Sequence, residues 1–233
     1  MAADVRHLRR IELFRDLSDR DLDALGALAQ RRRYGRGELI LQAGDERDGL
    51  FGVEEGAARL YRLSAEGHEI TLATFDVGDI FGLSFLSPRV GAVGAFEATA
   101  DGTVVAHISR QHVGSFVAAH PDVALSAFDL VGYRLASMGD LVEELALHDA
   151  WTRVAHVLPQ MARDAGGLRV VRASHREIAA RVGTREDEVT RALRHLRELG
   201  LVGSIPHRRG VVLRDVEALA RYRPARGARG PRR

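Results

Sequence analysis

Hydrophobic and polar positions change their pattern several times along the chain. Residues 8–30 read as short helices, with Ser18 as the expected cap of a helix and Asp21 three residues further on. Between residues 31 and 109, short β-forming segments such as "ELILQAG", "AARLYRLS" and "TVVAHIS" alternate with glycine-containing turns. This alternation predicts an antiparallel β sandwich or roll.

Residues 110–148 have helical periodicity, with Pro121 near a first turn. Apolar residues recur there at steps of three and four, the spacing of a coiled-coil seam. We predict that this stripe is the interface of a homodimer; the alternative is a helix packed on its own β domain. The predicted interface residues are Val131, Leu135, Met138, Val142 and Leu145.

Residues 150–222 indicate a small α+β unit. A helix over 151–163 and a strand in "GLRVVR" precede the helix pair "HREIAARVGTREDEVTRALRHL" of residues 175–196. Two strands around a tip containing Pro206 and Gly210, and a helix in "DVEALARY", follow. The helix pair predicts a helix-turn-helix and the two strands a wing. Its expected buried residues are Ile178, Ala179, Val182 and Val189, and Gly183 lies at the turn.

Composition adds a charge asymmetry. The 233-residue chain has no cysteine, which excludes disulfides and cysteine-bound iron–sulfur clusters. With no apolar run of membrane-spanning length and no signal-like N-terminus, we expect a cytoplasmic protein without membrane contact. Residues 1–148 contain 15 Arg and 23 Asp or Glu, a balance of −8, whereas residues 149–233 contain 19 Arg and 9 acids, a balance of +10. A basic C-terminal third predicts a partner that is a polyanion, here double-stranded DNA.

The second helix of the pair begins with three acids. We expect Thr184 to cap it, with the acids of the first turn stabilised by the helix dipole by about 0.3–1 kcal/mol. Asp187 is also placed to accept a hydrogen bond from cytosine N4, and Arg191 to donate two to guanine. Arg194 and the tip arginines are expected on phosphates. The predicted DNA-binding residues are Arg185, Glu186, Asp187, Thr190, Arg191, Arg194, Arg208 and Arg209.

This order of elements resembles the CRP/FNR family of bacterial transcription regulators over nearly the whole chain. The segments that carry the likeness are "GELILQAGD", "GHEITLATFDVGDIFG", "HREIAARVGTREDEVTRALRHLRELGLV" and "GVVLRDVEALA". The resemblance implies an α+β fold: an N-terminal sensor with a jelly-roll β roll (1–110), a dimerisation helix (111–148) and a winged helix-turn-helix (149–222). A disordered basic tail (223–233) follows. It also implies a homodimer on a palindromic site, and RNA polymerase as a partner if the protein is an activator.

The recognition helix resembles FNR-like members more than CRP-like ones. The family commonly has an acid where Asp187 stands and an arginine where Arg191 stands. FNR-like members have serine at the position of Thr190, and the cAMP-binding branch has arginine at the position of Glu186.

The sensor departs from the cyclic-nucleotide-binding pattern. In family members that bind cyclic nucleotides, a short loop and helix hold the sugar and phosphate of the ligand. They do so with a Glu directly after "FG" and an Arg-Ser or Arg-Thr pair about ten residues further on. Leu83, Val93 and Gly94 stand at those positions. Burying a cyclic phosphate without a charged partner is costly, and Arg89 is misplaced as a substitute. We therefore predict no cAMP binding in the usual manner; the expected pocket residues are Gly82, Leu83, Val93, Gly94, Met138 and Gly139.

Other effectors stay open. A haem cofactor would need an axial ligand, for which His68, His107, His112 and His148 are candidates. The alternatives are a cyclic nucleotide held in an atypical pocket, an apolar ligand, or no ligand. The chain contains no His-x-His, nucleophile elbow or phosphate-binding loop, so we expect neither an enzyme nor a metal site. Glu54 and Glu55 are candidate loop residues for contact with RNA polymerase.

Overall fold

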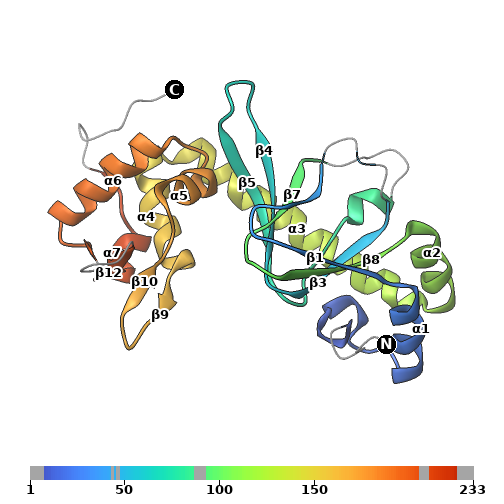
Figure 1. Cartoon of the computed structure of the whole chain (residues 1–233). Coiled ribbons are helices and arrows are strands. Elements are labelled where there is room, and N and C mark those ends of the chain that lie inside the picture. The colour runs from blue at the N-terminus through green and yellow to red at the C-terminus, as the bar shows by residue number, and fades with distance from the viewer. Residues whose placement is uncertain (1–7, 43–44, 46–47, 87–92, 205–209, 225–233) are drawn as a thin grey trace. The chain divides into compact units, whose positions relative to one another are not determined.

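The computed structural model describes residues 8–42, 45, 48–86, 93–204 and 210–224 (Figure 1). The chain forms two compact units. The first comprises Met1–Tyr61 and Leu72–Met138, and the second Arg62–Thr71 and Gly139–Arg233. Within the described ranges, no helix is long and apolar enough to cross a membrane.

Short helices open the first unit: η1 (Leu8–Arg10), η2 (Glu12–Phe14) and α1 (Asp19–Leu28). The Oγ of Ser18 accepts a hydrogen bond from the backbone N–H of Asp21 over 3.2 Å, which confirms the predicted cap. Leu22 and Leu25 of α1 are buried. The predicted helical start of the chain is therefore confirmed for the residues that the structure describes.

The predicted β roll is confirmed as two four-stranded antiparallel sheets. One sheet has the order β1-β8-β3-β6 and the other β2-β7-β4-β5. Their bounds are β1 (Gln30–Tyr34), β2 (Leu39–Leu41), β3 (Leu50–Glu55), β4 (Ala58–Leu63), β5 (Glu69–Phe75), β6 (Ile80–Phe81), β7 (Ala95–Ala98) and β8 (Thr103–Ile108). A short helix, η3 (Leu83–Leu86), follows β6.

Aromatic rings fill the interior of the roll. The Phe81 ring lies 4.7 Å from that of Phe96 and 5.3 Å from that of Phe51, centroid to centroid, and both pairs are stacked. Phe75 lies 5.1 Å from Phe81 and completes the group. Rings at such distances pack favourably beyond the area that they bury. The space between the sheets is therefore a packed core.

Two helices follow the roll where helical periodicity was predicted. They are α2 (Arg110–Ala119) and α3 (Pro121–Leu147). The break lies at His120, whose φ of −131° and ψ of 75° are not helical. A residue before proline is disfavoured in the helical region because the proline ring clashes with it. The predicted helix is thus confirmed with an interruption one residue before Pro121.

One face of α3 is apolar and exposed. The exposed fractions are 46% for Val131, 71% for Leu135, 43% for Met138 and 65% for Val142. A different face, with Val123, Ala127 and Leu130, packs in the core formed with the N-terminal helices. Packing on its own β domain therefore leaves these four predicted stripe residues uncovered, whereas the fifth, Leu145, is half-buried.

The second unit contains the predicted winged helix-turn-helix. Its elements are α4 (Ala150–Met161), β9 (Arg163–Asp164), β10 (Arg169–Val171), α5 (His175–Val182), α6 (Glu186–Glu198), β11 (Val202–Ser204), β12 (Val211–Leu213) and α7 (Val216–Ala220). The four strands form an antiparallel sheet of order β11-β12-β10-β9. Strand β9 was not predicted. The strands of the wing pair with Val202 opposite Leu213.

Candidate nucleic-acid interface

The helix-turn-helix is held by the residues that the sequence assigned to it. Ile178, Val182 and Val189 are buried at exposed fractions of 5% or less. Ser174 and Glu177 form a capping box that begins α5. Gly183 ends α5 with a φ of 64°, in the left-handed region that favours glycine. The buried residues and the left-handed Gly183 fix the turn between α5 and α6, the second helix of the motif.

The cap of α6 differs from the prediction. Its N-cap is Arg185 and makes no side-chain capping hydrogen bond, so the assignment of Thr184 as the cap was wrong. The backbone N–H of Thr184 instead donates to the carbonyl of Ala179 over 3.0 Å, which completes the end of α5. Without a side-chain cap, the acids of the first turn of α6 stabilise the helix through its dipole.

Asp187 and Arg191 lie together at the exposed start of α6. The Nη2 of Arg191 donates to Oδ2 of Asp187 over 2.8 Å. The Nε of Arg185 lies 3.6 Å from Oδ1 of the same carboxylate. A carboxylate and a guanidinium on neighbouring turns offer hydrogen-bond acceptors and donors side by side, the groups that read base edges in a major groove. The structure thus brings three of the predicted residues together.

Glu188 has a role that the sequence analysis missed. It is 4% exposed, and its carboxylate accepts hydrogen bonds from Nε1 of Trp151 over 3.1 Å and from Nη2 of Arg191. The sequence does carry a signal, because Glu188 precedes buried Val189 by one residue and Ala192 by four, which places it on the buried side of α6. Glu188 is therefore a positioning residue for Arg191.

Thr190 is engaged within the motif. Its hydroxyl donates to the carbonyl of Glu186 over 2.9 Å and accepts from Nδ1 of His175 over 2.8 Å. With both hydrogen bonds made, the hydroxyl is oriented and the methyl group is left for contact. His175, at the start of α5, was not among the predicted residues. Arg194 is exposed, and the predicted tip residues Arg208 and Arg209 lie outside the described residues.

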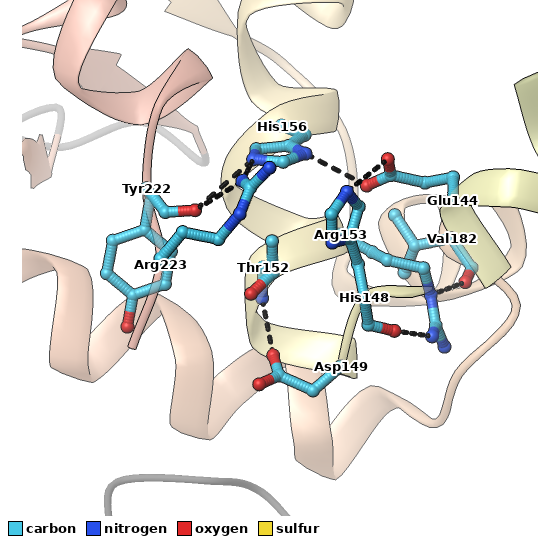
Figure 2. A network of polar contacts seen from close by, with 9 residues as sticks. All are labelled: Glu144, His148, Asp149, Thr152, Arg153, His156, Val182, Tyr222 and Arg223. Carbon is cyan, nitrogen blue, oxygen red and sulfur yellow. Dashed lines mark hydrogen bonds and ion pairs between the residues drawn. The ribbon is translucent and has the colours of Figure 1, made fainter. Parts of the chain in front are cut away.

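Arg153 fastens the turn of the motif to the end of α3 (Figure 2). Its guanidinium donates to the carbonyls of Val182 and His148, each over 2.8 Å, as Figure 2 shows. It also donates to the carbonyl of Gly183 over 3.3 Å. Burial lowers the pKa of the Arg153 guanidinium, against the opposing effect of nearby carboxylates. A half-buried cation thus supplies hydrogen-bond donors for carbonyls at two helix ends.

The predicted effector residues do not line one cavity. Leu83 borders an apolar cavity of about 30 Å³, enough for about one water molecule, together with residues such as Phe14 and Phe116. A second cavity of about 310 Å³ is lined by Gln30, Arg31, Arg32, Tyr34, Phe51, Val105 and His107. Neither lining includes Gly82, Val93, Gly94, Met138 or Gly139. Val93 is 39% and Met138 43% exposed.

The candidate haem ligands lie in separate surroundings. His68 is exposed. His107 stacks on Phe51 and has Nε2 2.8 Å from the carbonyl of Asp48. Nδ1 of His112 is buried with no hydrogen-bond partner among the described residues. His148 has Nε2 3.5 Å from Glu144.

The assignment of Glu54 and Glu55 to a loop was wrong, because both lie in β3. Glu54 is 4% exposed and pairs with Nε of Arg31 over 2.9 Å. A buried, paired carboxylate has no surface to offer to a polymerase. Glu55 is exposed and pairs with Nη2 of Arg33 over 3.1 Å.

Comparison with known proteins agrees with this architecture. A family model described as a Crp-like helix-turn-helix domain matches residues 152–222, and one described as a cyclic nucleotide-binding domain matches residues 31–120. The cyclic AMP receptor protein of Thermus thermophilus is 30% identical over 208 residues, 88% of this chain and 95% of that protein. The global nitrogen regulator of a Synechocystis strain is 28% identical over 177 residues, 72% of this chain and 78% of that protein.

A solved structure gives the same result for the fold. FixK2 from Bradyrhizobium japonicum superimposes with a TM-score of 0.70 at 27% identity, covering 84% of this chain and 98% of that one. The β roll, the long helix and the helix-turn-helix define a transcription regulator with a DNA-binding and a cyclic-nucleotide-binding-like domain. The chain belongs to the CRP/FNR family of such regulators.

Proposed function

We propose that the protein is a homodimer that binds a palindromic DNA site through α6 and so controls transcription. The observation that carries this proposal is the pairing of Asp187 with Arg191 at the exposed start of α6. Arg191 also donates a hydrogen bond to the buried carboxylate of Glu188, and Trp151 donates to the same carboxylate. Side chains that are oriented before binding lose less conformational freedom when they meet a base pair.

The exposed stripe of α3 supports the dimer. Phe128, 72% exposed, extends the predicted residues by one turn at the same spacing of three and four. Apolar side chains exposed in a continuous stripe are typical of an interface. A second copy of α3 is the occupant that the repeat fits. Two recognition helices related by a two-fold axis read half-sites about 34–36 Å apart, one turn of DNA.

Asp187 and Arg191 are the two side chains of α6 that we propose to read bases. We propose that Arg191 donates to O6 and N7 of guanine while Asp187 accepts from N4 of a cytosine nearby, with Arg194 on a phosphate. Their present mutual ion pair is exchanged for these contacts on binding. The wing arginines Arg208 and Arg209 are proposed to contact phosphates without reading sequence.

We further propose that any effector is bound without the usual cyclic-nucleotide contacts. The positions that would face a cyclic phosphate hold Leu83, Val93 and Gly94, and none carries a charge. Leu83 instead borders a small apolar cavity. An anionic ligand there would lose hydration without gaining a charged partner. Calorimetric titration with cAMP tests this point, and a measured affinity in the micromolar range or tighter would contradict it.

Selection from a pool of randomised palindromes tests the main proposal. The absorption spectrum of the purified protein is recorded first, because a haem band would reveal a bound cofactor. We expect recovery of one two-fold sequence with half-sites one turn apart. Binding that depends on salt equally for all sequences, with no preferred palindrome after effector-free and cAMP-supplemented selections, would contradict sequence-specific regulation.

A further inference from the structure

Three potential metal ligands meet where α3 ends and α4 begins (Figure 2). Glu144 belongs to the last turn of α3, His148 follows that helix directly, and His156 lies in the middle of α4. Each offers one ligand atom, and the three atoms lie within 4.8 Å of one another. All three side chains are partly buried, with exposed fractions of 31% for Glu144, 18% for His148 and 15% for His156.

The distances suit a small divalent ion. Nδ1 of His156 lies 3.0 Å from Oε1 of Glu144, and Nε2 of His148 lies 3.5 Å from Oε2. With metal–ligand bonds of about 2.0–2.1 Å, neighbouring ligands of a tetrahedral ion are about 3.3 Å apart. Each imidazole therefore lies at nearly a ligand spacing from one of the two Glu144 oxygens, and small movements of the side chains would bring all three groups around one ion.

We propose that Glu144, His148 and His156 bind a divalent transition-metal ion of the zinc class. Two imidazoles and one carboxylate suit zinc, nickel or cobalt, whereas magnesium and calcium prefer oxygen ligands alone. Three protein ligands leave a fourth position for water. The sequence analysis expected no metal site, because the chain contains no His-x-His. Glu144 and His148 lie four residues apart, but His156 comes from another helix, so the sequence pattern does not bring the three together.

Metal binding requires the proton of the His156 ring to move from one ring nitrogen to the other. Nε2 lies 2.7 Å from Nη1 of Arg223, and a guanidinium only donates, so Nε2 accepts and Nδ1 carries the proton toward Glu144. An ion on Nδ1 requires the proton on Nε2. The carbonyl of Tyr222, 3.3 Å from Nε2, is in place to accept it. A backbone carbonyl on the second nitrogen is the usual support for a metal-bound histidine.

Two arginines lower the affinity of this site. Arg223 must leave Nε2 of His156 when the ion binds, and it keeps its hydrogen bond to the carbonyl of Tyr222 at 2.9 Å as an alternative. Arg153 directs its donors at three backbone carbonyls, but its charge is close enough to interact with Glu144. We therefore expect a dissociation constant on the order of micromolar.

Binding is tested on the untagged full-length protein with Co²⁺ and Zn²⁺ as the probes. Co²⁺ is expected to give the strong visible absorption of a four-coordinate ion, and one Zn²⁺ per chain to displace it. Glu144→Gln and His156→Gln should each weaken Zn²⁺ binding by about 100-fold or more, since loss of even a supporting contact costs about 10–100-fold. His68→Gln, a substitution of an exposed histidine outside the cluster, should leave binding unchanged.

Arg223→Gln is the sharper variant, because Arg223 is exposed and its removal frees Nε2 of His156. It should tighten Zn²⁺ binding by about threefold to tenfold. Each variant is checked by thermal unfolding in EDTA, and only variants that unfold like the unsubstituted protein are compared. No Co²⁺ spectrum, a weak six-coordinate one, or equal Zn²⁺ affinity in the Glu144→Gln and unsubstituted proteins would overturn the proposal.

The ion would join the last turn of α3 to α4, and a consequence for DNA binding rests on the proposed function. We expect Zn²⁺ to change the affinity for the selected palindrome in the unsubstituted protein and not in Glu144→Gln. The metal titrations contain no DNA, so the two proposals fail separately. An unchanged DNA affinity with one bound Zn²⁺ would overturn the regulatory consequence and leave the metal site established.

Discussion

The indole N–H of Trp151 donates to the buried carboxylate of Glu188 over 3.1 Å, and the same carboxylate accepts from Arg191. This relationship joins α4 to α6 through one acid. A buried charge without partners is costly, but here an indole and a guanidinium share it. The side chain proposed to read guanine is therefore positioned by a buried residue of the same helix.

We predict that Glu188→Leu lowers the free energy of unfolding by about 1–3 kcal/mol, because Trp151 and Arg191 lose their shared acceptor. Glu188→Gln should cost less, since an amide oxygen still accepts from the indole. Urea unfolding followed by fluorescence measures both, and Trp151 is the chain's single tryptophan. Glu186→Gln, at an exposed acid of the same turn, is the control. Equal stability of all three variants would remove the positioning role of Glu188.

The substitution Arg191→Lys tests whether Arg191 reads a base or contributes only its positive charge to DNA binding. The lysine keeps a positive charge beside Glu188 but lacks the fork that donates twice to guanine. We expect a loss of about 1–3 kcal/mol in discrimination at one base pair of each half-site. Arg194→Lys, one turn further along α6, should leave the preference unchanged. Competition binding with single-base variants of the selected palindrome measures this, and an unaltered preference in Arg191→Lys would refute the assignment.

Patterns of burial were predictable from the sequence, whereas pairings between side chains were not. The β roll and the helix-turn-helix follow from local periodicity and from glycines such as Gly183, whose backbone φ is 64°. The cap of α6 was mispredicted because the backbone N–H of Thr184 completes the end of α5 by its hydrogen bond to Ala179. Helix α6 therefore begins after Arg185. Glu188 and Trp151 are 37 residues apart, so no local pattern reports their contact. Long-range partners require the fold itself.

Val142→Asp tests the dimer. Val142 is 65% exposed in the stripe of α3, and a charge there would be buried against a second copy at high cost. We expect sedimentation to show a monomer. We also expect the monomer itself to stay folded, because Val142 is exposed in the single chain. Tyr133→Asp is the matched control: Tyr133 is 67% exposed but lies two residues from both Val131 and Leu135, on the far side of the helix. A dimer that persists in Val142→Asp would show that another surface mediates association.

Arg153→Met tests the junction between α4 and the turn of the helix-turn-helix. The substitution leaves the carbonyls of Val182, Gly183 and His148 without their donor. We expect the free energy of unfolding to fall by about 1–3 kcal/mol. Arg153→Lys should recover part of it, because one ammonium cannot reach three carbonyls as a planar guanidinium does. Arg163→Met, at an exposed arginine of β9, should unfold like the unsubstituted protein; if it lost as much stability, the effect would not be specific to the junction.

We predict that Tyr222 lowers the stability of the second unit at alkaline pH. Its hydroxyl is buried without a hydrogen-bond partner among the described residues, and burial, aided by Asp149, raises the pKa of Tyr222. The unfolded chain then releases this proton near pH 10 while the native state still holds it. The native state binds more protons in that window, so the free energy of unfolding decreases as pH rises from about 10 toward the folded-state pKa.

Tyr222→Phe should remove this part of the alkaline slope and raise the free energy of unfolding at neutral pH by up to about 1 kcal/mol, because an unpaired buried hydroxyl is lost. Tyr133→Phe, at an exposed tyrosine, should do neither. Urea unfolding between pH 7 and about pH 11, with the ultraviolet absorption of tyrosinate recorded in parallel, measures both effects. If Tyr222→Phe kept the slope of the unsubstituted protein, or lost stability at neutral pH, the hydroxyl would have to be hydrogen-bonded, and the burial argument for Tyr222 would fail.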